Sequence, residues 1–253
     1  ESIILKEKPN FIINASAYTA VDAAEDNIEL ANKINYAAVK NLSNQCFIKN
    51  IILLHISTDY VFDGNADIPY SEECETNPIT EYGKSKLKGE KSIIKSKCQY
   101  IIIRSAWIFS EYGNNFLKTM LELAKSNDEP DIVSDQIGAP TYAQDLALLI
   151  KKIIYKIKDN NDFQNWGIYN YCGDLPCTWH DFAVYIFLTA KKHGLKTPNN
   201  INPISSGAYK TKAKRPKYSV LSNNKVKDIF YIKASNWRSG ISSSIKKMYA
   251  KGH

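Results

Sequence analysis

The segment Ile51–Ile56 constrains the fold more than any other stretch, because every position in it except His55 is apolar. Such a run predicts a strand that is covered on both faces, which is typical of a parallel sheet between layers of helices. Three further stretches have the same character: Phe11–Ala15, Tyr100–Ile103 and Gly167–Tyr171. Because helical patterns separate these stretches, we predict an α/β fold with a doubly wound parallel sheet.

Helices are predicted where apolar residues recur at intervals of three and four, in Glu1–Lys8, Asn27–Phe47, Thr80–Ser92, Phe116–Ser126, Tyr142–Ile157 and Thr178–Lys192. Within the second of these, the apolar stripe is assigned to Ile28, Ala31, Ile34, Ala38, Leu42 and Cys46. Asn35 lies off that stripe, so no special role is predicted for it. His55 is interpreted as a core histidine whose hydrogen bonds are satisfied. Asp131–Gln136 is predicted as a further strand, and Ile201–Ile204, the loop Ser205–Ser219 and two short helices complete the chain.

The composition is that of a globular protein. The chain has 253 residues, of which 44% are hydrophobic and 23% charged, enough for one large domain or two closely packed ones. No apolar run approaches the ~20 residues that a membrane span needs, and Glu1–Pro9 is too charged for a signal peptide. Five scattered cysteines argue against a disulfide framework, and the close pair Cys172 and Cys177 has no neighbouring histidine cluster for zinc. We therefore expect a cytoplasmic protein with no membrane partner.

The formal charge of +7 raises the question of nucleic-acid binding. Most of the excess lies in Lys151–Lys158, Lys191–Lys196, Lys210–Lys217 and Lys246–Lys251. The first, second and fourth segments are interpreted as solvated helix faces or ends. Lys210–Lys217 is a basic loop, but a pyrophosphate group explains it as well as a nucleic acid does. No nucleic-acid partner is therefore predicted.

The residues that can carry chemistry follow the strand Ile51–Ile56. Thr58 and Asp59 stand at its carboxyl end, where ligands bind in open α/β sheets. Tyr82 and Lys86 lie four residues apart, so on a helix they project from one face. A lysine ammonium near a phenol is predicted to lower the pKa of Tyr82 from its usual value of about 10, which gives an acid–base group useful near neutral pH. Thr58 can hydrogen-bond the same substrate oxygen, because a hydroxyl group both donates and accepts.

Thr58 followed by Tyr82-x-x-x-Lys86 resembles the extended short-chain dehydrogenase/reductase family. Longer phrases occur in the order seen in dTDP-4-dehydrorhamnose reductases: Asn14–Asp22, Ser57–Phe62, Tyr82–Lys86, Arg104–Trp107, Gly113–Phe116, Asp135–Thr141, Thr178–Asp181 and Arg215-Pro216. The likeness covers almost the whole chain. A full set of ordered motifs is far more specific than one Tyr-x-x-x-Lys.

The resemblance implies a Rossmann-like fold and reduction of the C4 ketone of dTDP-4-dehydro-L-rhamnose by NADPH or NADH, in the synthesis of cell-surface polysaccharide such as O-antigen. The catalytic residues that it implies are Thr58, Tyr82 and Lys86. Those at the cofactor are Ala15, Ala17, Tyr18, Thr19, Ile56, Tyr82 and Lys86. Those at the dTDP-sugar are Val21, Thr58, Asp59, Trp107, Asn115 and Arg215.

Several of these positions have a structural alternative. The loop Asn14–Asp22 can be a strand-to-helix turn in which small residues pack closely. Trp107 can cap the core, and Asn115 can cap the helix that begins at Phe116. Trp179 and His180 are given structural roles in the first turn of their helix.

The predicted domain division assigns 1–106 and 137–173 to the cofactor, and 107–136 and 174–253 to the sugar nucleotide. Neither G-x-G-x-x-G nor G-x-x-G-x-x-G occurs in the sequence, although a dinucleotide-binding fold needs such a turn. We therefore expect an N-terminally incomplete sheet, with the missing unit in about forty to fifty residues upstream of Glu1. The alternative is a natural fragment that cannot hold the cofactor properly.

Two alternatives stay open beside the reductase interpretation. One is a reductase or epimerase of another nucleotide-linked keto sugar, and the other is a non-catalytic regulatory relative. The sequence leaves the sugar, the choice between NADH and NADPH, and a homodimer open. Some members of the family dimerise through Mg²⁺, but the segment around Gln144 and Lys246–Lys251 lacks carboxylates for it, so no metal site is predicted.

Overall fold

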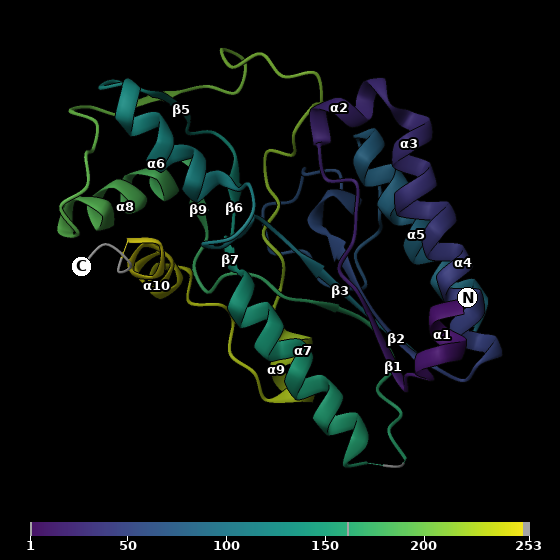
Figure 1. Cartoon of the computed structure of the whole chain (residues 1–253). Coiled ribbons are helices and arrows are strands. Elements are labelled where there is room, and N and C mark those ends of the chain that lie inside the picture. Colours follow the sequence, from purple (N-terminus) through teal and green to yellow (C-terminus); the bar gives the residue numbers. More distant parts are fainter. Residues whose placement is uncertain (1, 161, 250–253) are drawn as a thin grey trace.

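A parallel sheet of four strands, in the order β1-β2-β3-β8, lies at the centre of the molecule (Figure 1). The computed structural model describes residues 2–160 and 162–249. The strands are β1 (Phe11–Asn14), β2 (Ile52–Thr58), β3 (Tyr100–Ser105) and β8 (Gly167–Asn170). In this register Leu54 of β2 lies between Ile13 and Ile101 of its neighbours. The four predicted apolar strands and the parallel α/β class are confirmed.

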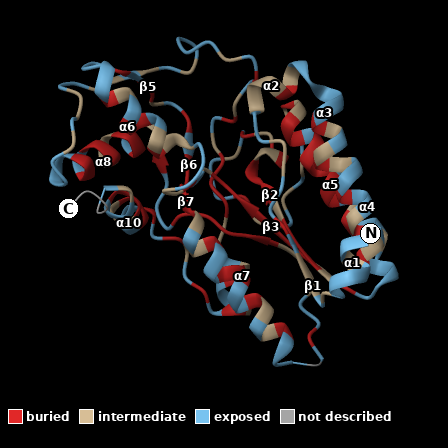
Figure 2. Cartoon of the chain, in the orientation of Figure 1, coloured by how far each residue is buried: buried red, intermediate tan, exposed pale blue. Residues whose placement is uncertain are grey.

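Helices cover both faces of this sheet (Figure 1). The helices of one face are α1 (Ser2–Glu7), α4 (Val39–Ile48) and α5 (Glu81–Ser96), and those of the other are α7 (Ala143–Lys158) and α9 (Asn224–Phe230). Leu53 and Ile102 pack towards α4 and α5, whereas Leu54 and Ile101 pack towards α7. In Figure 2, β3 is coloured as buried along nearly all of its length. This burial on two faces is why the strands are apolar at nearly every position.

A second hydrophobic core lies beyond the carboxyl ends of the strands. It is built by α6 (Phe116–Ser126), α8 (Trp179–Lys192) and α10 (Trp237–Tyr249). Three short strand pairs connect it to the sheet: β5 (Asp131–Val133) with β10 (Asn202–Ile204), β4 (Ile108–Phe109) with β7 (Thr141–Tyr142), and β6 (Ile137–Gly138) with β9 (Cys177–Thr178). The range of α6 is as predicted. The prediction for Asp131–Gln136 is correct only as far as Val133, and α10 is longer than the short helix expected.

The predicted helix Asn27–Phe47 is interrupted. It consists of α3 (Ile28–Asn32), the π-helical turn η1 (Lys33–Ala38) and α4, and a short helix α2 (Val21–Asp26) precedes it. The residues buried along it are Ala31, Asn35, Val39, Ser43 and Cys46. The predicted stripe is therefore wrong in part, because Ile28 is 43% exposed and Ala38 is exposed. The wider π turn rotates the helix and brings Asn35 onto the inner face.

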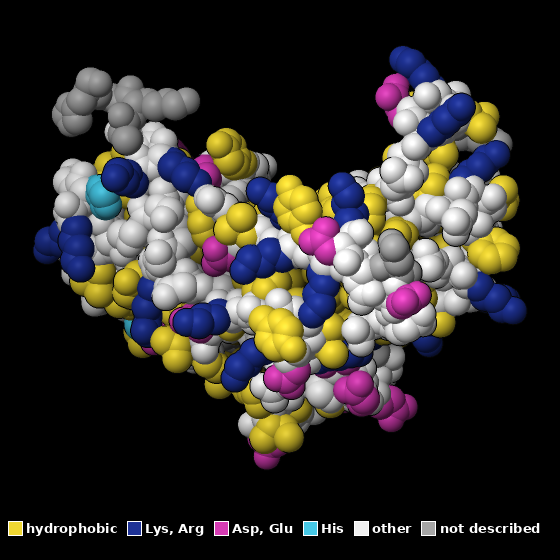
Figure 3. All heavy atoms as spheres, turned by 90° about the horizontal axis from the view of Figure 1, so that it is seen from below, with side chains coloured by type: hydrophobic (Ala, Val, Ile, Leu, Met, Phe, Trp, Pro, Cys, Tyr) yellow, Lys and Arg dark blue, Asp and Glu magenta, His cyan; other side chains and the backbone are white. Residues whose placement is uncertain are grey.

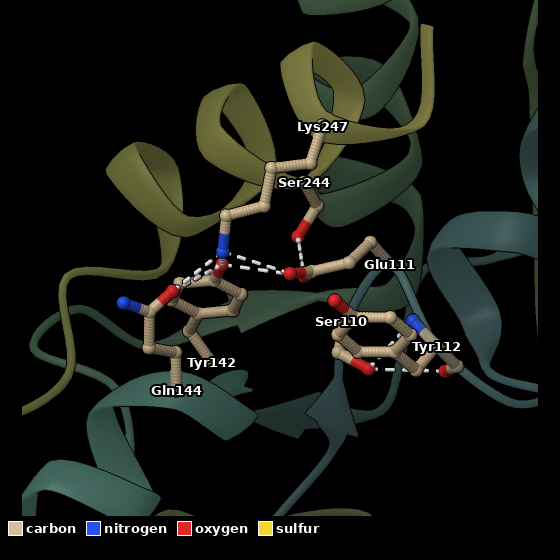
Figure 4. A network of polar contacts seen from close by, with 7 residues as sticks. All are labelled: Ser110, Glu111, Tyr112, Tyr142, Gln144, Ser244 and Lys247. Carbon is tan, nitrogen blue, oxygen red and sulfur yellow. Dashed lines mark hydrogen bonds and ion pairs between the residues drawn. The ribbon is translucent and has the colours of Figure 1, made fainter. Parts of the chain in front are cut away.

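A polar cluster around Lys247 fastens α10 to the rest of the molecule (Figure 4). The ammonium Nζ lies 2.8 Å from Glu111 Oε1, 2.9 Å from the hydroxyl of Tyr142 and 2.6 Å from Gln144 Oε1. Ser244, one turn before Lys247, donates to the other carboxylate oxygen of Glu111 at 3.3 Å. A lysine ammonium thus lies beside Gln144, in the segment for which no metal site was predicted.

The surface carries its positive charge in scattered positions on the face that Figure 3 shows, with Lys and Arg side chains spread among apolar and uncharged ones. In the described ranges, the longest helices are too short or too polar to cross a membrane. All five cysteines are free thiols.

Candidate active site

Tyr82 is carried to the end of β2 by the first turn of α5. The N-cap of this helix is Thr80, whose hydroxyl accepts a hydrogen bond from the Gly83 N–H at 3.0 Å. Gly83 lies directly against the backbone that follows Thr58, since a Cβ atom at this position would be 2.2 Å from the carbonyl oxygen of Tyr60. A residue without a side chain is needed for this approach, and it brings Tyr82 to the strand end.

Thr58, Asp59 and Tyr82 come together at the carboxyl end of β2, where all three side chains are buried. Thr58 Oγ1 donates a hydrogen bond to Asp59 Oδ1 at 3.0 Å. Burial raises the pKa of Tyr82 above its usual value, and a side-chain hydrogen bond with Thr58 offsets part of that rise. Burial also raises the pKa of Asp59 to about 6. The Tyr82 phenol therefore keeps its proton at neutral pH, as a proton donor must.

Lys86 lies one turn further along α5 and is also buried. Its Nζ donates a hydrogen bond to the carbonyl oxygen of Ile56 at 2.7 Å and lies 3.5 Å from His55 Nε2. Burial lowers the pKa of Lys86 to about 8, and the charge of Glu90 opposes this. The prediction that Lys86 lowers the pKa of Tyr82 is wrong for this arrangement, because the ammonium faces the backbone of β2 and burial dominates at the phenol.

A buried ion pair supports α5 beneath these residues. Arg104 of β3 donates to Glu90 of α5 through Nε at 3.1 Å and through Nη2 at 2.7 Å. Ser57 of β2 donates to the same carboxylate. Because the Glu90 carboxylate accepts from both the guanidinium and the hydroxyl group, the two charges are compensated inside the core, although Arg104 Nη1 has no partner in the described parts of the chain. The pair fixes the helix that carries Tyr82 and Lys86 against both central strands.

The loop after β1 carries the predicted cofactor residues, of which Ala15 and Thr19 are exposed and Ala17 and Tyr18 half-buried. Asn35, which is 1% exposed, holds this loop. Its Oδ1 accepts from the Tyr18 N–H at 2.8 Å, and its Nδ2 donates to the Tyr18 carbonyl at 3.0 Å and to Ser85 Oγ at 2.9 Å. The prediction that Asn35 has no special role is therefore wrong, because its amide links the loop to α5.

Arg215 connects the C-terminal loop to the reaction centre. Its Nη2 donates to Asp22 Oδ2 at 2.6 Å, and its Nη1 donates to the hydroxyl of Tyr60 at 3.3 Å. The Tyr60 ring in turn meets the Tyr82 ring edge-on, with 5.5 Å between the centroids. Val21 packs in the same small cluster. Asp22 was missed by the sequence analysis, although it stands beside Val21 in a motif of the family.

A cavity of about 580 Å³ lies between α6, β5, α8 and the loop 205–215. Its walls combine apolar side chains such as Met120 and Trp179 with polar ones such as Gln136, and Arg215 lines it as well. A wider groove of about 840 Å³, between the outer faces of α4 and α5, contains none of the predicted site residues. Arg215 is the predicted site residue that lines the smaller cavity, and its contact with Tyr60 links this cavity to Tyr82.

Trp107 stacks on Trp179, which lines this cavity, with 3.4 Å between ring centroids and 6° between ring planes. Trp107 has a left-handed backbone, with φ of 48°, and its indole lies against Gly138, where a Cβ atom would be 2.3 Å from the ring. The sequence analysis gave Trp179 a structural role only, and the structure places it in the cavity wall as well. The contact between the two rings joins residues 72 positions apart, so nothing in the local sequence pattern indicates it.

Asn115 directly precedes Phe116, which lines the cavity. Its Oδ1 accepts from the Lys118 N–H at 3.3 Å, and its Nδ2 donates to the carbonyls of Ser110 and Tyr112. It is therefore the N-cap of α6, as one alternative expected. Contact with a substrate stays a prediction for this residue.

Taken together, this site can donate a proton to an oxygen atom but holds no side chain that could transfer a hydride. Carbonyl reduction here needs a hydride-donating cofactor such as nicotinamide, and Tyr82 with Lys86 on α5, beside the end of β2, resembles the arrangement in short-chain dehydrogenase/reductases. Fold and site thus define the class of short-chain dehydrogenase/reductase enzymes.

Comparison with known proteins narrows the class. The family model described as RmlD substrate binding domain matches residues 1–250. A dTDP-4-dehydrorhamnose reductase from Aggregatibacter actinomycetemcomitans is 42% identical over 238 residues, or 94% of this chain and 81% of that protein. Another, from Escherichia coli (strain K12), is 36% identical over 243 residues, or 96% of this chain and 81% of that protein.

Solved structures agree with these relatives. A crystal structure of dTDP-4-dehydrorhamnose reductase from Bacillus anthracis, in complex with NADP, superposes with a TM-score of 0.89 at 34% identity. The match covers 97% of this chain and 83% of that one. This chain belongs to the dTDP-4-dehydrorhamnose reductase family.

Proposed function

We propose that this protein reduces the C4 ketone of dTDP-4-dehydro-L-rhamnose to dTDP-L-rhamnose, with NADPH or NADH as the reductant. The observation that carries the proposal is the meeting of Thr58 and Tyr82 at the end of β2, with Lys86 one helical turn away. The relatives named as reductases of this substrate support the choice of sugar. The product is a precursor of cell-surface polysaccharide.

Thr58, Tyr82 and Lys86 each have a separate role in the proposed reduction. Thr58 holds the ketone oxygen by a hydrogen bond, and Tyr82 donates its proton to that oxygen as negative charge develops there. A phenol whose pKa is raised by burial is not ionised beforehand, so the proton is available when an alkoxide, a stronger base than a phenolate, forms. The nicotinamide supplies the hydride when it is bound. Lys86 returns a proton to Tyr82 after each turnover.

The part of the cofactor site in this chain fits the nicotinamide half of the dinucleotide. The ammonium of Lys86 and the hydroxyl of Tyr82 are the groups that would hold a ribose. Ile56 and the loop residues Ala15, Ala17, Tyr18 and Thr19 would line the same side. The hydrogen bonds from Asn35 give this loop a defined shape, which supports its proposed role.

The sugar nucleotide would lie in the cavity of about 580 Å³, whose size suits such a ligand. Arg215 would bind the diphosphate, since a guanidinium can donate two parallel hydrogen bonds to phosphate oxygens. Trp107 and Asn115 would lie towards the sugar, and Val21 and Asp59 at its reacting end. The second core of α6, α8 and α10 supports the proposed division into a cofactor region (1–106 and 137–173) and a sugar-nucleotide region (107–136 and 174–253).

The proposal places the protein in the cytoplasm, where nucleotide-linked sugars and reduced nicotinamide are found. The five free cysteines are compatible with that reducing compartment. A homodimer is a possible oligomeric state of this protein, and light scattering would measure it.

Replacement of Tyr82 by Phe tests the proposal. The ring and its packing are kept and only the proton is removed, so turnover should fall by a factor on the order of 10² to 10⁴. Affinity for the dTDP-sugar, measured by calorimetry, should stay within about twofold. Tyr112→Phe, at an exposed tyrosine outside the site, is the matched control. Near-full turnover in Tyr82→Phe would refute the role, and analysis of products from several dTDP- and UDP-linked keto sugars would identify a different substrate.

A further inference from the structure

A chain of hydrogen bonds runs behind Lys86, from the loop after β1 to the end of β2. Asn14 Oδ1 accepts from the backbone N–H of Ser16 at 3.2 Å and from its hydroxyl at 2.7 Å. Asn14 Nδ2 lies 3.0 Å from His55 Nδ1. His55 Nε2 lies 3.5 Å from Lys86 Nζ. Asn14 and His55 are both buried, and His55 is fully enclosed.

The chain determines which nitrogen of His55 carries the proton. Two donors on Ser16 point at one end of the Asn14 side chain, so that end is the oxygen and the other end is the NH₂ group. An NH₂ group donates, and His55 Nδ1 must therefore accept. Burial keeps the imidazole neutral by lowering the pKa of His55 well below its usual value. A neutral ring that accepts at Nδ1 has its hydrogen on Nε2.

This tautomer directs an N–H group at Lys86. The lysine Nζ already donates to the carbonyl of Ile56 at 2.7 Å. An ammonium has only donors, so the His55 Nε2–H and an ammonium oppose each other, whereas a neutral amine has a lone pair that can accept from Nε2–H. We propose that His55 is a positioning residue that weakens proton binding at Lys86, and that Asn14 holds the tautomer through which it acts.

The inference rests on the proposed function, because it gives Lys86 the task of restoring the Tyr82 proton. In that step an N–H bond at Lys86 breaks, its electron pair stays on the nitrogen, and an O–H bond forms on the phenolate, directly or through a bridging hydroxyl. The new lone pair then accepts from His55 Nε2–H. His55 thus stabilises the state of Lys86 that exists after the proton has been given away.

Other charged groups nearby raise or lower the pKa of Lys86 or of Tyr82. Glu90, one turn along α5, favours the ammonium, and Arg104 of β3 neutralises much of that carboxylate through its bidentate pair. Asp59, beyond the end of β2, acts on Tyr82. On the proposal, His55 on β2 acts in the same direction as burial, and against Glu90, on the proton affinity of Lys86.

Nuclear magnetic resonance of the full chain with ¹³C-labelled lysine tests this without substrate or cofactor. The Lys86 signal is identified by its loss in Lys86→Arg, and its pKa is read from the titration. In Asn14→Asp the carboxylate accepts from His55 Nδ1–H, which turns Nε2 into an acceptor for the ammonium. The proton affinity of Lys86 should then rise about tenfold or more. When His55 is also replaced by Leu, Asn14→Asp should raise the pKa of Lys86 by less than half as much.

An equal rise in both backgrounds would show that the new charge acts through space, and would overturn the proposal. Asn14→Leu gives a second test that adds no charge. Loss of the Asn14 donor frees His55 to reverse its tautomer, so the pKa of Lys86 should rise. Greater burial by an apolar side chain alone would lower it, and a lowered or unchanged pKa would also overturn the proposal. Because these titrations need no turnover, they stand even if the reductase assignment fails.

Discussion

The buried carboxyl group of Asp59 gives a prediction whose size follows from the structure. Asp59 is 2% exposed, and its Oδ2 has no hydrogen-bond partner among residues 2–160 and 162–249. Its pKa is raised from about 3.9 in an unfolded chain to about 6 in the folded one. The folded state therefore binds this proton more tightly than the unfolded state does. Stability is complete below the unfolded pKa and is lost as the pH rises through the folded value.

The magnitude follows from the difference of about two pKa units. At about 1.4 kcal/mol for each unit, ionisation of Asp59 costs roughly 3 kcal/mol of folding free energy at neutral pH. Asp59→Asn removes the titration and keeps an oxygen that can accept from Thr58. The stability of the variant relative to the native sequence should therefore increase by about 2.4 kcal/mol between pH 4 and pH 7.5, since about half a kcal/mol is already lost at pH 4.

Urea denaturation at five or six pH values measures this difference. The NH₂ group that Asp59→Asn introduces adds a constant offset, because a buried donor without a partner costs about 1–3 kcal/mol at every pH. The pH-dependent part is thus the test. Asp63→Asn is the control, since hydrogen bonds from the Asn65 N–H and the Tyr70 hydroxyl lower the pKa of Asp63. Its relative stability should change in the opposite direction with pH. A difference for Asp59→Asn that does not vary with pH would refute the reasoning.

Three further changes probe the supporting contacts. Asn35→Ala should lower the unfolding free energy by about 1–3 kcal/mol and weaken cofactor binding, because the backbone of Tyr18 loses both partners; an unaltered urea midpoint and cofactor affinity would contradict this. Lys247→Met should lower the melting temperature, since Glu111 loses its ammonium partner, but leave turnover unchanged, since neither residue belongs to the proposed site. Equal melting temperatures for Lys247→Met and Lys247→Arg would contradict this. Arg215→Lys should weaken dTDP-sugar binding about tenfold in calorimetry, because an ammonium cannot form two parallel hydrogen bonds, and unchanged affinity would remove Arg215 from the diphosphate site.

The central sheet and the reaction centre could be predicted because both depend on local patterns. A strand such as β2 is buried on two faces and is apolar for that reason, so its position is visible in one stretch of sequence. Tyr82 and Lys86 are four residues apart on an unbroken helix, and their common face follows from helix geometry alone. No knowledge of distant residues was needed for either prediction.

Predictions failed where distant segments decide the outcome. The interpretation of Asn35 assumed a regular helix, and the π turn η1 shifted the buried face by a fraction of a turn. One signal was available, because Ala31, Asn35 and Val39 recur at intervals of four. The ion pair of Arg215 with Asp22 joins residues 193 positions apart, and the pKa of Tyr82 depends on how completely the folded chain excludes water. None of these could be derived from spacing.

The buried polar atoms that lack a partner in the described parts of the chain are Asp59 Oδ2, Arg104 Nη1 and Asn170 Oδ1. Asp59 directly follows β2, Arg104 lies in β3 and Asn170 is the last residue of β8. The three groups therefore share the carboxyl edge of the central sheet. An unmet buried group costs free energy, and a fold selected for stability alone would pair it or replace it. Ligands bind at this edge in open α/β sheets. The lost stability is therefore concentrated where polar groups of a substrate or an ordered water could complete the hydrogen bonds, and Asp59→Asn should recover more of it as the pH rises.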